Sequence, residues 1–351
     1  MFGKRKKQVV GCDIGSSAIK LVELKPSKSG EFQLVHAASA VLSPEAIVDG
    51  AIMDSSLVVE ALSHLIAENN IKSSSFGTSL SGHSVIIKRI QLPAMSEAEL
   101  AESIQWEAEQ YIPFDINDVN LDYVVLDSST DDSMDALLVA VKKDRVADFT
   151  SVLVQAGKEP VLVDVDVFAL QNAYEVNYGV PEETVALVNI GASVMNINVI
   201  DHGASVFWRD VAFGGNQYTE AIQQEFNLAR EDAERLKLGE RVGEHSVQNV
   251  LGVVNSVSED LAAELQKTID FFVATSAVDR LEKLVLAGGG AQVLNLGDVL
   301  KERFQVDVEV MNPFRNIRYS ESDFDPEWIN RNAPGMSVAV GLAVRTVGDG
   351  K

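Results

Sequence analysis

The sequence predicts an α/β protein built from two related lobes, and three features of the chain predict this fold. In residues 9–20, an expected apolar strand ends at Asp13 and is followed by Ile-Gly, by small residues and by a second expected strand. Residues 186–197 repeat this arrangement with Asn189 in place of the aspartate. At 286–291, a third expected apolar strand is followed by three consecutive glycines. The repeat of one turn in each half indicates a duplicated core.

The two strand–turn–strand segments suit a phosphate group. A backbone that turns tightly without bulky side chains exposes consecutive N–H groups, and such a concave nest binds anions. Gly15 and Gly191 are expected to allow the close approach and unusual dihedral angles that the turns require. One such turn is equally well explained as an ordinary hairpin. The ordered set of three glycine turns favours a phosphate chain held between two lobes.

Length, composition and charge set the class of protein. A chain of 351 residues exceeds one typical core, and 46% hydrophobic with 23% charged residues is typical of globular proteins. The net charge of −23 argues against nucleic-acid binding, which requires neutralisation of phosphates. No signal peptide pattern is present, and no apolar run approaches the ~20 residues of a spanning helix. We therefore expect a cytoplasmic protein with no direct membrane span.

Two smaller features have simple interpretations. The basic run at 4–7, Lys-Arg-Lys-Lys, is interpreted either as a solvated leader or as a contact with an anionic membrane surface. Cys12 is the single cysteine, so the chain forms no internal disulfide, and its apolar surroundings predict a buried thiol.

The first lobe is predicted to begin with three strands, followed by a helix whose apolar residues Leu57, Ala61 and Leu65 share one face. A second block then starts with a capping box, Ser96 to Glu99, that opens an acidic helix ending before Pro113. Its strand-helix-strand-strand-helix-strand order predicts a small α+β insertion at 87–160. The expected elements up to this point are strands at 8–14, 18–24, 32–42, 77–81, 85–92, 119–126, 135–141 and 159–165, and helices at 54–69, 96–111 and 144–156, with a polar loop at 127–133.

The second half is predicted to repeat the three-strand pattern at 183–213, with a hairpin turn at His202-Gly203. Helices are expected at 166–178, 216–226, 231–238, 258–278, 294–304 and 335–346, and strands at 284–286 and 308–311. The domains predicted from this pattern are a first lobe of 1–86 with 161–182 and 331–351, the insertion at 87–160, and a second lobe of 183–330. The second lobe is expected to include a helical subdomain at about 214–284, and its contact with nucleotide is an implication of the family resemblance described below.

Two lobes that each open with a phosphate hairpin, followed by a strand–glycine turn–helix, resemble the actin, Hsp70 and hexokinase superfamily. Within it, nearly the whole chain resembles the actin-like, FtsA-related assembly proteins, above all the PilM family of type IV pilus assembly. The segments that carry this resemblance are GCDIGSSAIKLVE at 11–23, LPAMSE at 92–97, WEAEQYIPF at 106–114, NIGA at 189–192 and NPF at 312–314. The second and third lie in the expected insertion and distinguish the chain from a sugar kinase.

The resemblance implies an actin-like ATPase fold that holds ATP with Mg²⁺ between the lobes. Each expected contact is transferred to a matching residue of this chain. Phosphate contacts would come from both turns and a lysine, ribose and adenine contacts from a Glu–Lys pair on one helix face, and backbone contact with adenosine from the glycine turn. Asp13 would hold a water of the bound Mg²⁺, and Asp166 would supply a second acidic group. The implied nucleotide site is Asp13, Gly15, Ser16, Ser17, Lys20, Gly191, Ala192, Ser193, Glu234, Lys237, Gly288, Gly289 and Gly290.

Two of these assignments have a plain structural alternative, and one position departs from the superfamily. Without the resemblance, Lys20 is interpreted as a solvated lysine on a strand. Glu234 and Lys237 are then interpreted as an ordinary ion pair on a helix. Asn189 occupies a position where many relatives carry aspartate, and a neutral amide cannot act as a base. Asp13 and Asp166 therefore remain as the metal-side carboxylates. We expect ATP binding with slow or no hydrolysis, and we assign no catalytic residue.

The resemblance further implies a cytoplasmic scaffold of the pilus assembly platform, held peripherally at the inner membrane by a protein partner. That partner would be the N-terminal cytoplasmic peptide of a single-pass inner-membrane protein similar to PilN, docked beside the insertion. Pilus motor ATPases are a further implied partner class. Tyr111, Ile112 and Phe114 are the candidate peptide contacts, although each also suits the insertion's own core. The alternatives are a small-molecule kinase of the same superfamily, which would need an Asp base facing a substrate cleft, and an FtsA-like division protein.

Overall fold

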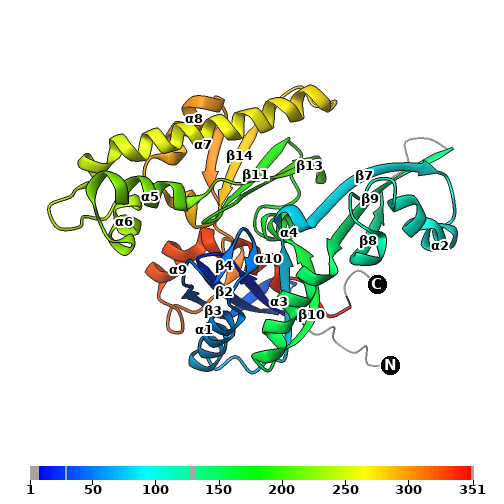
Figure 1. Ribbon diagram of the computed structural model, residues 1–351, viewed down its shortest axis with the longest axis horizontal. Coiled ribbons are helices and arrows are strands. Elements are labelled where there is room, and N and C mark those ends of the chain that lie inside the picture. The colour runs from blue at the N-terminus through cyan, green and yellow to red at the C-terminus, as the bar shows by residue number, and fades with distance from the viewer. Residues whose placement is uncertain (1–7, 28–29, 127–131, 349–351) are drawn as a thin grey trace.

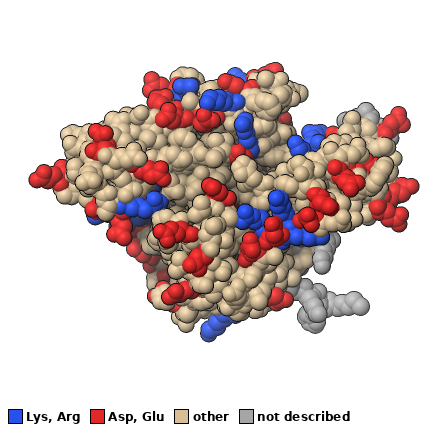
Figure 2. All heavy atoms as spheres, viewed as in Figure 1, with Lys and Arg blue, Asp and Glu red and all other residues tan. Residues whose placement is uncertain are grey.

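Figure 1 shows the computed structural model, which describes residues 8–27, 30–126 and 132–348. Two lobes lie one above the other, and a smaller unit projects sideways from their junction. The basic run at 4–7 and most of the loop expected at 127–133 lie outside the described residues. Acidic and basic side chains are scattered over the face seen in Figure 2.

Lobe 1 is built on a six-stranded mixed sheet. β1 forms the predicted antiparallel hairpin with β2 and pairs in parallel with β6. The helices α1 (Ser55–Glu68) and α3 (Lys143–Gln155) contribute apolar side chains to the core on one face of this sheet. From edge to edge the sheet runs β10 (Glu159–Val165), β6 (Ser75–Leu80), β1 (Val10–Ile14), β2 (Ala18–Pro26), β3 (Phe32–Val41) and β16 (Ile317–Arg318).

Lobe 2 repeats the same plan on a five-stranded sheet. β11 forms an antiparallel hairpin with β12 and pairs in parallel with β14, as β1 does with β2 and β6. The helices α5 (Gly215–Phe226), α6 (Arg230–Lys237), α7 (Val247–Thr275) and α8 (Leu296–Phe304) share the core on its outer face. The sheet order is β13 (Ala204–Val211), β12 (Met195–Asp201), β11 (Val185–Ile190), β14 (Lys283–Ala287) and β15 (Asp307–Val310).

A shared core joins the lobes. Apolar side chains of α4 (Asp166–Tyr178), α9 (Pro326–Asn332) and α10 (Ser337–Ala343) pack there with residues of both sheets. The crossing of α4 and α10 is too close for a side chain at Gly341, because a Cβ there would lie 1.6 Å from the carbonyl oxygen of Ala169. Glycine is required at such a backbone contact. The two helices that link the lobes are thus in direct contact.

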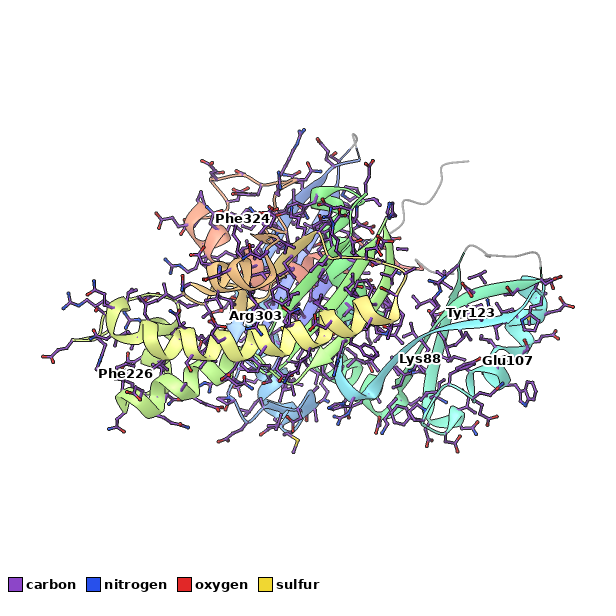
Figure 3. All side chains as sticks on the ribbon, turned by 90° about the horizontal axis from the view of Figure 1, so that it is seen from above. Lys88, Glu107, Tyr123, Phe226, Arg303 and Phe324 are labelled. Atoms are coloured by element: carbon purple, nitrogen blue, oxygen red, sulfur yellow. The ribbon has the colours of Figure 1, made fainter. Side chains whose placement is uncertain are left out.

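The projecting unit is a three-stranded antiparallel sheet with its own core. It consists of β7 (Val85–Pro93), α2 (Glu97–Ala108), β8 (Val119–Val125) and β9 (Ser133–Lys142), in the strand order β7-β9-β8. The capping box predicted at its helix is present, since the Ser96 hydroxyl accepts the N–H of Glu99 and the Glu99 carboxylate accepts the N–H of Ser96. Seen from above in Figure 3, this unit extends away from both lobes, with Lys88, Tyr123 and Glu107 along it.

The structure shortens the expected insertion at its C-terminal end. Helix α3 buries Phe149, Val152 and Leu153 in the lobe 1 core, and β10 pairs with β6 of the lobe 1 sheet. The boundary at 160 was placed from element order alone, and that order does not reveal which sheet a strand joins. In addition, β16 pairs with β3 in lobe 1, although 183–330 was expected to form lobe 2.

Most other expected elements lie within a few residues of their predicted bounds, but α7 is longer than expected and several short elements were not predicted. Helix α7 begins at Val247 rather than at 258, because Val250, Val254 and Leu261 continue its buried stripe through a stretch rich in small polar residues. Helix α9 was not predicted; Asp325 caps it and proline stands in its first turn. Two short hairpin strands, β4 (Ile47–Val48) and β5 (Ala51–Ile52), also appear beside the cleft.

Candidate functional site

A cavity of ≈ 870 Å³ lies between the two lobes. This volume falls within the range of small-molecule and cofactor sites. Its wall includes both strand–turn–strand segments, the three-glycine turn and part of α6, four regions that are far apart in the sequence. All of the nucleotide-site residues predicted from the sequence, together with Asp166, line this one cavity.

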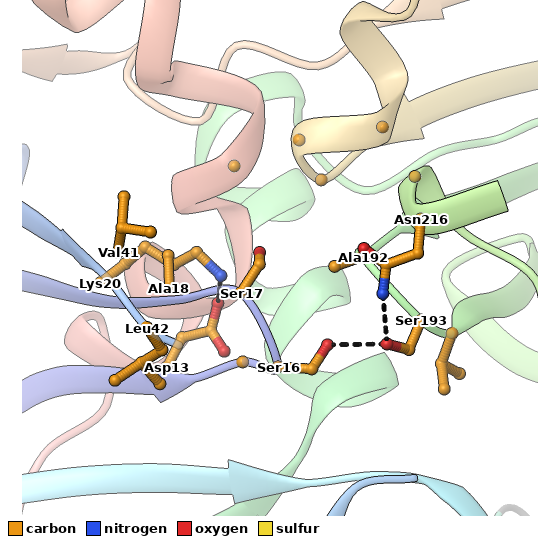
Figure 4. A pocket seen from close by; sticks show the side chains of 18 of the residues that line it. Asp13, Ser16, Ser17, Ala18, Lys20, Val41, Leu42, Ala192, Ser193 and Asn216 are labelled. Atoms are coloured by element: carbon orange, nitrogen blue, oxygen red, sulfur yellow. Dashed lines mark hydrogen bonds and ion pairs between the residues drawn. The ribbon is translucent and has the colours of Figure 1, made fainter. Parts of the chain in front are cut away.

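The first turn presents two serines and an ion pair to the cavity (Figure 4). The N–H of Gly15 donates to the carbonyl oxygen of Ala18 at 3.0 Å and closes the hairpin. Lys20 Nζ lies 3.0 Å from Asp13 Oδ2, so the lysine expected at phosphate also neutralises the carboxylate expected at the metal. Gly15 does not have a positive φ, and its role is close approach rather than an unusual dihedral angle.

The second turn is held against the start of α5. The N–H groups of Gly215 and Asn216 donate to the carbonyl oxygens of Gly191 and Ala192 at 2.9 and 2.8 Å. A Cβ at Gly214 would lie 2.5 Å from the Gly191 oxygen, so glycine is needed at this contact. Gly191, like Gly15, has no positive φ. The segment Gly214-Gly215-Asn216 is a site element that the sequence analysis missed, although two glycines at a strand–helix junction are a readable signal.

The two turns meet across the cleft. Ser16 Oγ and Ser193 Oγ lie 3.1 Å apart, and Asn216 Nδ2 donates to Ser193 Oγ at 3.1 Å (Figure 4). Each turn comes from a different lobe, so a ligand that contacts both would respond to the angle between the lobes. This arrangement suits a phosphate chain clamped from two sides.

Two carboxylates face the cavity on the lobe 1 side. Burial, reinforced by the charge of Asp13, raises the pKa of Asp166 to about 6. A nearby cation would favour the ionised form and lower this pKa again. Asp13 and Asp166 are therefore suited to hold Mg²⁺ through its water molecules, since carboxylates and water are the ligands that this ion prefers. In the described part of the chain, no group of three or more His, Cys, Asp or Glu side chains is arranged so that it could hold a metal ion by itself.

The opposite end of the cavity contains a buried lysine. Lys237 is 5% exposed, and its Nζ donates to Glu234 Oε2 at 2.6 Å and to Thr219 Oγ1 at 3.0 Å. Burial lowers the pKa of Lys237, and the Glu234 carboxylate opposes that shift. Arg230 lies nearby, and its guanidinium donates to Asn216 Oδ1 at 2.5 Å. The predicted Glu–Lys pair thus lines the cavity, with the lysine buried, and Arg230 is a lining cation that the sequence analysis missed.

The three glycines of the last turn differ in what surrounds them. Gly288 has φ +82°, and a Cβ there would lie 2.3 Å from the carbonyl oxygen of Ile190. A Cβ at Gly290 would lie 2.4 Å from the Ile190 side chain. A Cβ at Gly289 would meet no atom within 4 Å and would stand in the cavity. Gly288 and Gly290 therefore serve packing, and Gly289 leaves room for a ligand.

The three candidate peptide contacts in the projecting unit differ in accessibility. Ile112 is 6% exposed and belongs to the unit's own core, with Phe114 packed against that core under Lys142. Tyr111 is 38% exposed. Because Ile112 is buried in the unit's own core, it is not available for contact with a partner. Trp106, 70% exposed on α2, is the large aromatic that the sequence analysis did not single out.

Comparison with known proteins defines the class first. The fold is shared with the ethanolamine utilization protein EutJ from Carboxydothermus hydrogenoformans, at 15% sequence identity and a TM-score of 0.59. That match covers 96% of this chain and 89% of EutJ. MreB5 of Spiroplasma citri bound to ADP matches at 13% identity and TM-score 0.52, covering 96% and 95% of the two chains. The chain is thus an actin-like α/β protein with two lobes around a central cleft.

The family follows from two further matches. The profile of the family described as type IV pilus assembly protein PilM matches residues 11–347. The solved structure of a PilM-PilN type IV pilus biogenesis complex matches at 28% identity and TM-score 0.86, covering 97% of this chain and 99% of that chain. The chain belongs to the PilM family of type IV pilus assembly proteins. Within the described residues, no helix is both long and apolar enough to cross a membrane.

Proposed function

We propose that this chain is an ATP-binding scaffold of the type IV pilus assembly platform. The observation that carries the proposal is the convergence of the predicted residues of both lobes on one cavity of ≈ 870 Å³. In this arrangement the two turns hold the phosphates from opposite sides, and Lys20 supplies positive charge. The glycine turn and the Glu234–Lys237 pair provide the surface for ribose and adenine.

A bound Mg²⁺ would neutralise phosphate charge, with Asp13 and Asp166 holding its water molecules. Hydrolysis is expected to be slow, because the second turn carries Asn189 instead of a carboxylate. The Asn189 amide is also occupied, since its Nδ2 donates to Asn196 Oδ1 at 2.9 Å. A neutral amide has no basic atom to accept a proton from an attacking water.

The second part of the proposal concerns the partner. The complex named above pairs a PilM with PilN, and we propose that this chain binds the N-terminal cytoplasmic peptide of a PilN-like single-pass membrane protein. A hollow of ≈ 280 Å³ lies at the base of the projecting unit, between the start of β7, the N-terminus of α4 and Trp208. An extended peptide placed there would contact both lobes and the unit. Its membrane segment would hold the scaffold peripherally at the inner membrane, where the pilus motor ATPases would be further partners.

Two measurements test this function. Titration of the purified full-length chain with ATP should show saturable binding that weakens when Mg²⁺ is chelated. Affinity capture of the tagged chain from detergent-solubilised membranes, followed by mass spectrometry, should recover a single-pass pilus protein. Absence of ATP binding would refute the nucleotide role. Recovery of the chain without such a partner would refute the scaffold role.

A further inference from the structure

A path of three polar side chains leads out of the cavity to the projecting unit. Asn189 Nδ2 donates to Asn196 Oδ1 at 2.9 Å, and Asn196 Nδ2 donates to Asp210 Oδ1 at 2.8 Å. The second oxygen of the same carboxylate, Asp210 Oδ2, accepts the N–H of Gly82 at 2.5 Å. Gly82 begins the short 3-10 turn (Gly82–Ser84) that leads directly into β7. The path therefore joins the strand of the second phosphate turn to the base of the projecting unit.

The carboxylate at 210 determines the direction of every bond in this path. An ionised carboxylate only accepts hydrogen bonds, so Asn196 must direct its Nδ2 toward Asp210 and its Oδ1 toward Asn189. Asn189 must then donate through its own Nδ2. Its Oδ1 is left facing the last glycine turn, where a Cβ at Gly288 would lie 2.7 Å from it. Asp210 thus orients an amide that stands in the cavity wall.

The middle residue of the path, Asn196, depends on its two hydrogen-bond partners because it is buried. Asn196 is 3% exposed, so water cannot easily replace a bond that it loses, and an unsatisfied buried amide is costly. The same edge strand, β13, contacts the projecting unit a second time, where Trp208 Nε1 donates to the carbonyl oxygen of Ile87 at 3.0 Å. Figure 1 shows β13 beside the base of β7. A shift of β11 or β12 at the cleft would therefore disturb both contacts of β13, the one from Asp210 to Gly82 and the one from Trp208 to Ile87.

We propose that Asp210 couples ligand binding in the cleft to the position of the projecting unit, through Asn196 and Asn189. This inference rests on the proposed function, because it names the regulation of that nucleotide site and of the docking surface beside it. A coupling of this kind is reciprocal: a partner that repositions the unit changes nucleotide affinity by the same factor as nucleotide changes the partner's affinity.

The substitution Asp210→Asn tests the path with little disturbance. An amide offers one accepting oxygen and one donating nitrogen, whereas both Asn196 and Gly82 present donors. The variant therefore loses at least one of the two bonds. Asp210 is exposed, so the variant should fold. Asp260→Asn is the matched control, because it makes the same change of charge at an exposed position on α7, away from the path.

The experiment measures hydrogen exchange of the amides at 82–93 in the full-length chain, with and without saturating Mg-ATP, alongside the ATP dissociation constant. In the wild type and in Asp260→Asn, ATP should change this exchange by about ten-fold, within the range typical of coupled sites. In Asp210→Asn the change should fall below about two-fold, with ATP affinity within about three-fold of the wild type. Asp210→Ala, which removes both acceptors, should behave in the same way.

Each other result overturns the coupling. An undiminished exchange response in Asp210→Asn would show that the signal passes elsewhere, and no response in an ATP-bound wild type would show that the sites are independent. If the wild type bound no ATP, the binding measurement itself would show that the proposed function had failed, and the coupling with it.

Discussion

The substitution Gly289→Val separates ligand binding from folding. A Cβ at Gly289 would meet no atom within 4 Å at the cavity wall, and the backbone there has no positive φ. The neighbouring glycines do not offer this test, because a side chain at Gly288 or Gly290 would collide with Ile190. We therefore expect Gly289→Val to fold with an unchanged melting temperature and to fill space that adenosine needs.

The size of the effect follows from the volume added. Valine brings three carbon atoms to the wall against which the ligand would lie. Forcing extra methyl groups into a fitted contact typically costs about 1–3 kcal/mol, which corresponds to a loss of roughly 5- to 150-fold in affinity. A ligand that cannot move away within the cleft would lose more, up to abolition of measurable binding.

The assay is calorimetric titration of Mg-ATP into the wild type, Gly289→Val and the control Gly252→Val. Gly252 lies on α7, where a Cβ would also meet no atom within 4 Å, and it does not line the cavity. The control should bind ATP like the wild type. Binding by a folded Gly289→Val within about two-fold of the wild type would refute the placement of adenosine on this turn.

Three further predictions concern the cleft and the projecting unit. The pKa of Asp166 is raised to about 6 in the folded chain, so ionisation of this carboxyl between about pH 4 and pH 6 destabilises the folded state. Asp166→Asn should therefore raise the free energy of unfolding at pH 7 by about 1–3 kcal/mol, measured by urea unfolding. The same substitution should weaken Mg²⁺-dependent ATP binding. Wild-type ATP turnover should fall below the ordinary enzyme range of about 1–10³ s⁻¹, and Asn189→Asp should raise it if the other groups are placed for catalysis; fast wild-type turnover in a phosphate-release assay would contradict this. Replacing 86–140 by Asn-Gly should keep ATP binding and abolish partner-dependent membrane co-sedimentation, because Val85 pairs directly with Val141 and a two-residue turn can join them; persistent co-sedimentation would place the docking surface elsewhere.

The boundaries of that deletion show where sequence reasoning reached its limit. Removing 87–160, the insertion expected from the sequence, would delete the buried Phe149, Val152 and Leu153 and the lobe 1 strand β10. Strand and helix order is readable from hydrophobic period, and the repeated hairpins were readable from their glycines. The sheet that a strand joins depends on pairing between distant segments, which one sequence does not reveal. The same limit explains why β16 was assigned to lobe 2.

The cleft residues were more predictable than the partner surface, and the reason is physical. A tight strand–turn–strand segment needs small residues in a fixed local order, so Gly15 and Gly191 are recognisable without any tertiary contact. A docking surface has no local requirement of this kind. Ile112 and Trp106 belong to the same short segment, and both are apolar residues on or beside one helix, yet 6% of the first and 70% of the second is exposed. Only the packing of α2 on its sheet decides which of them faces a partner.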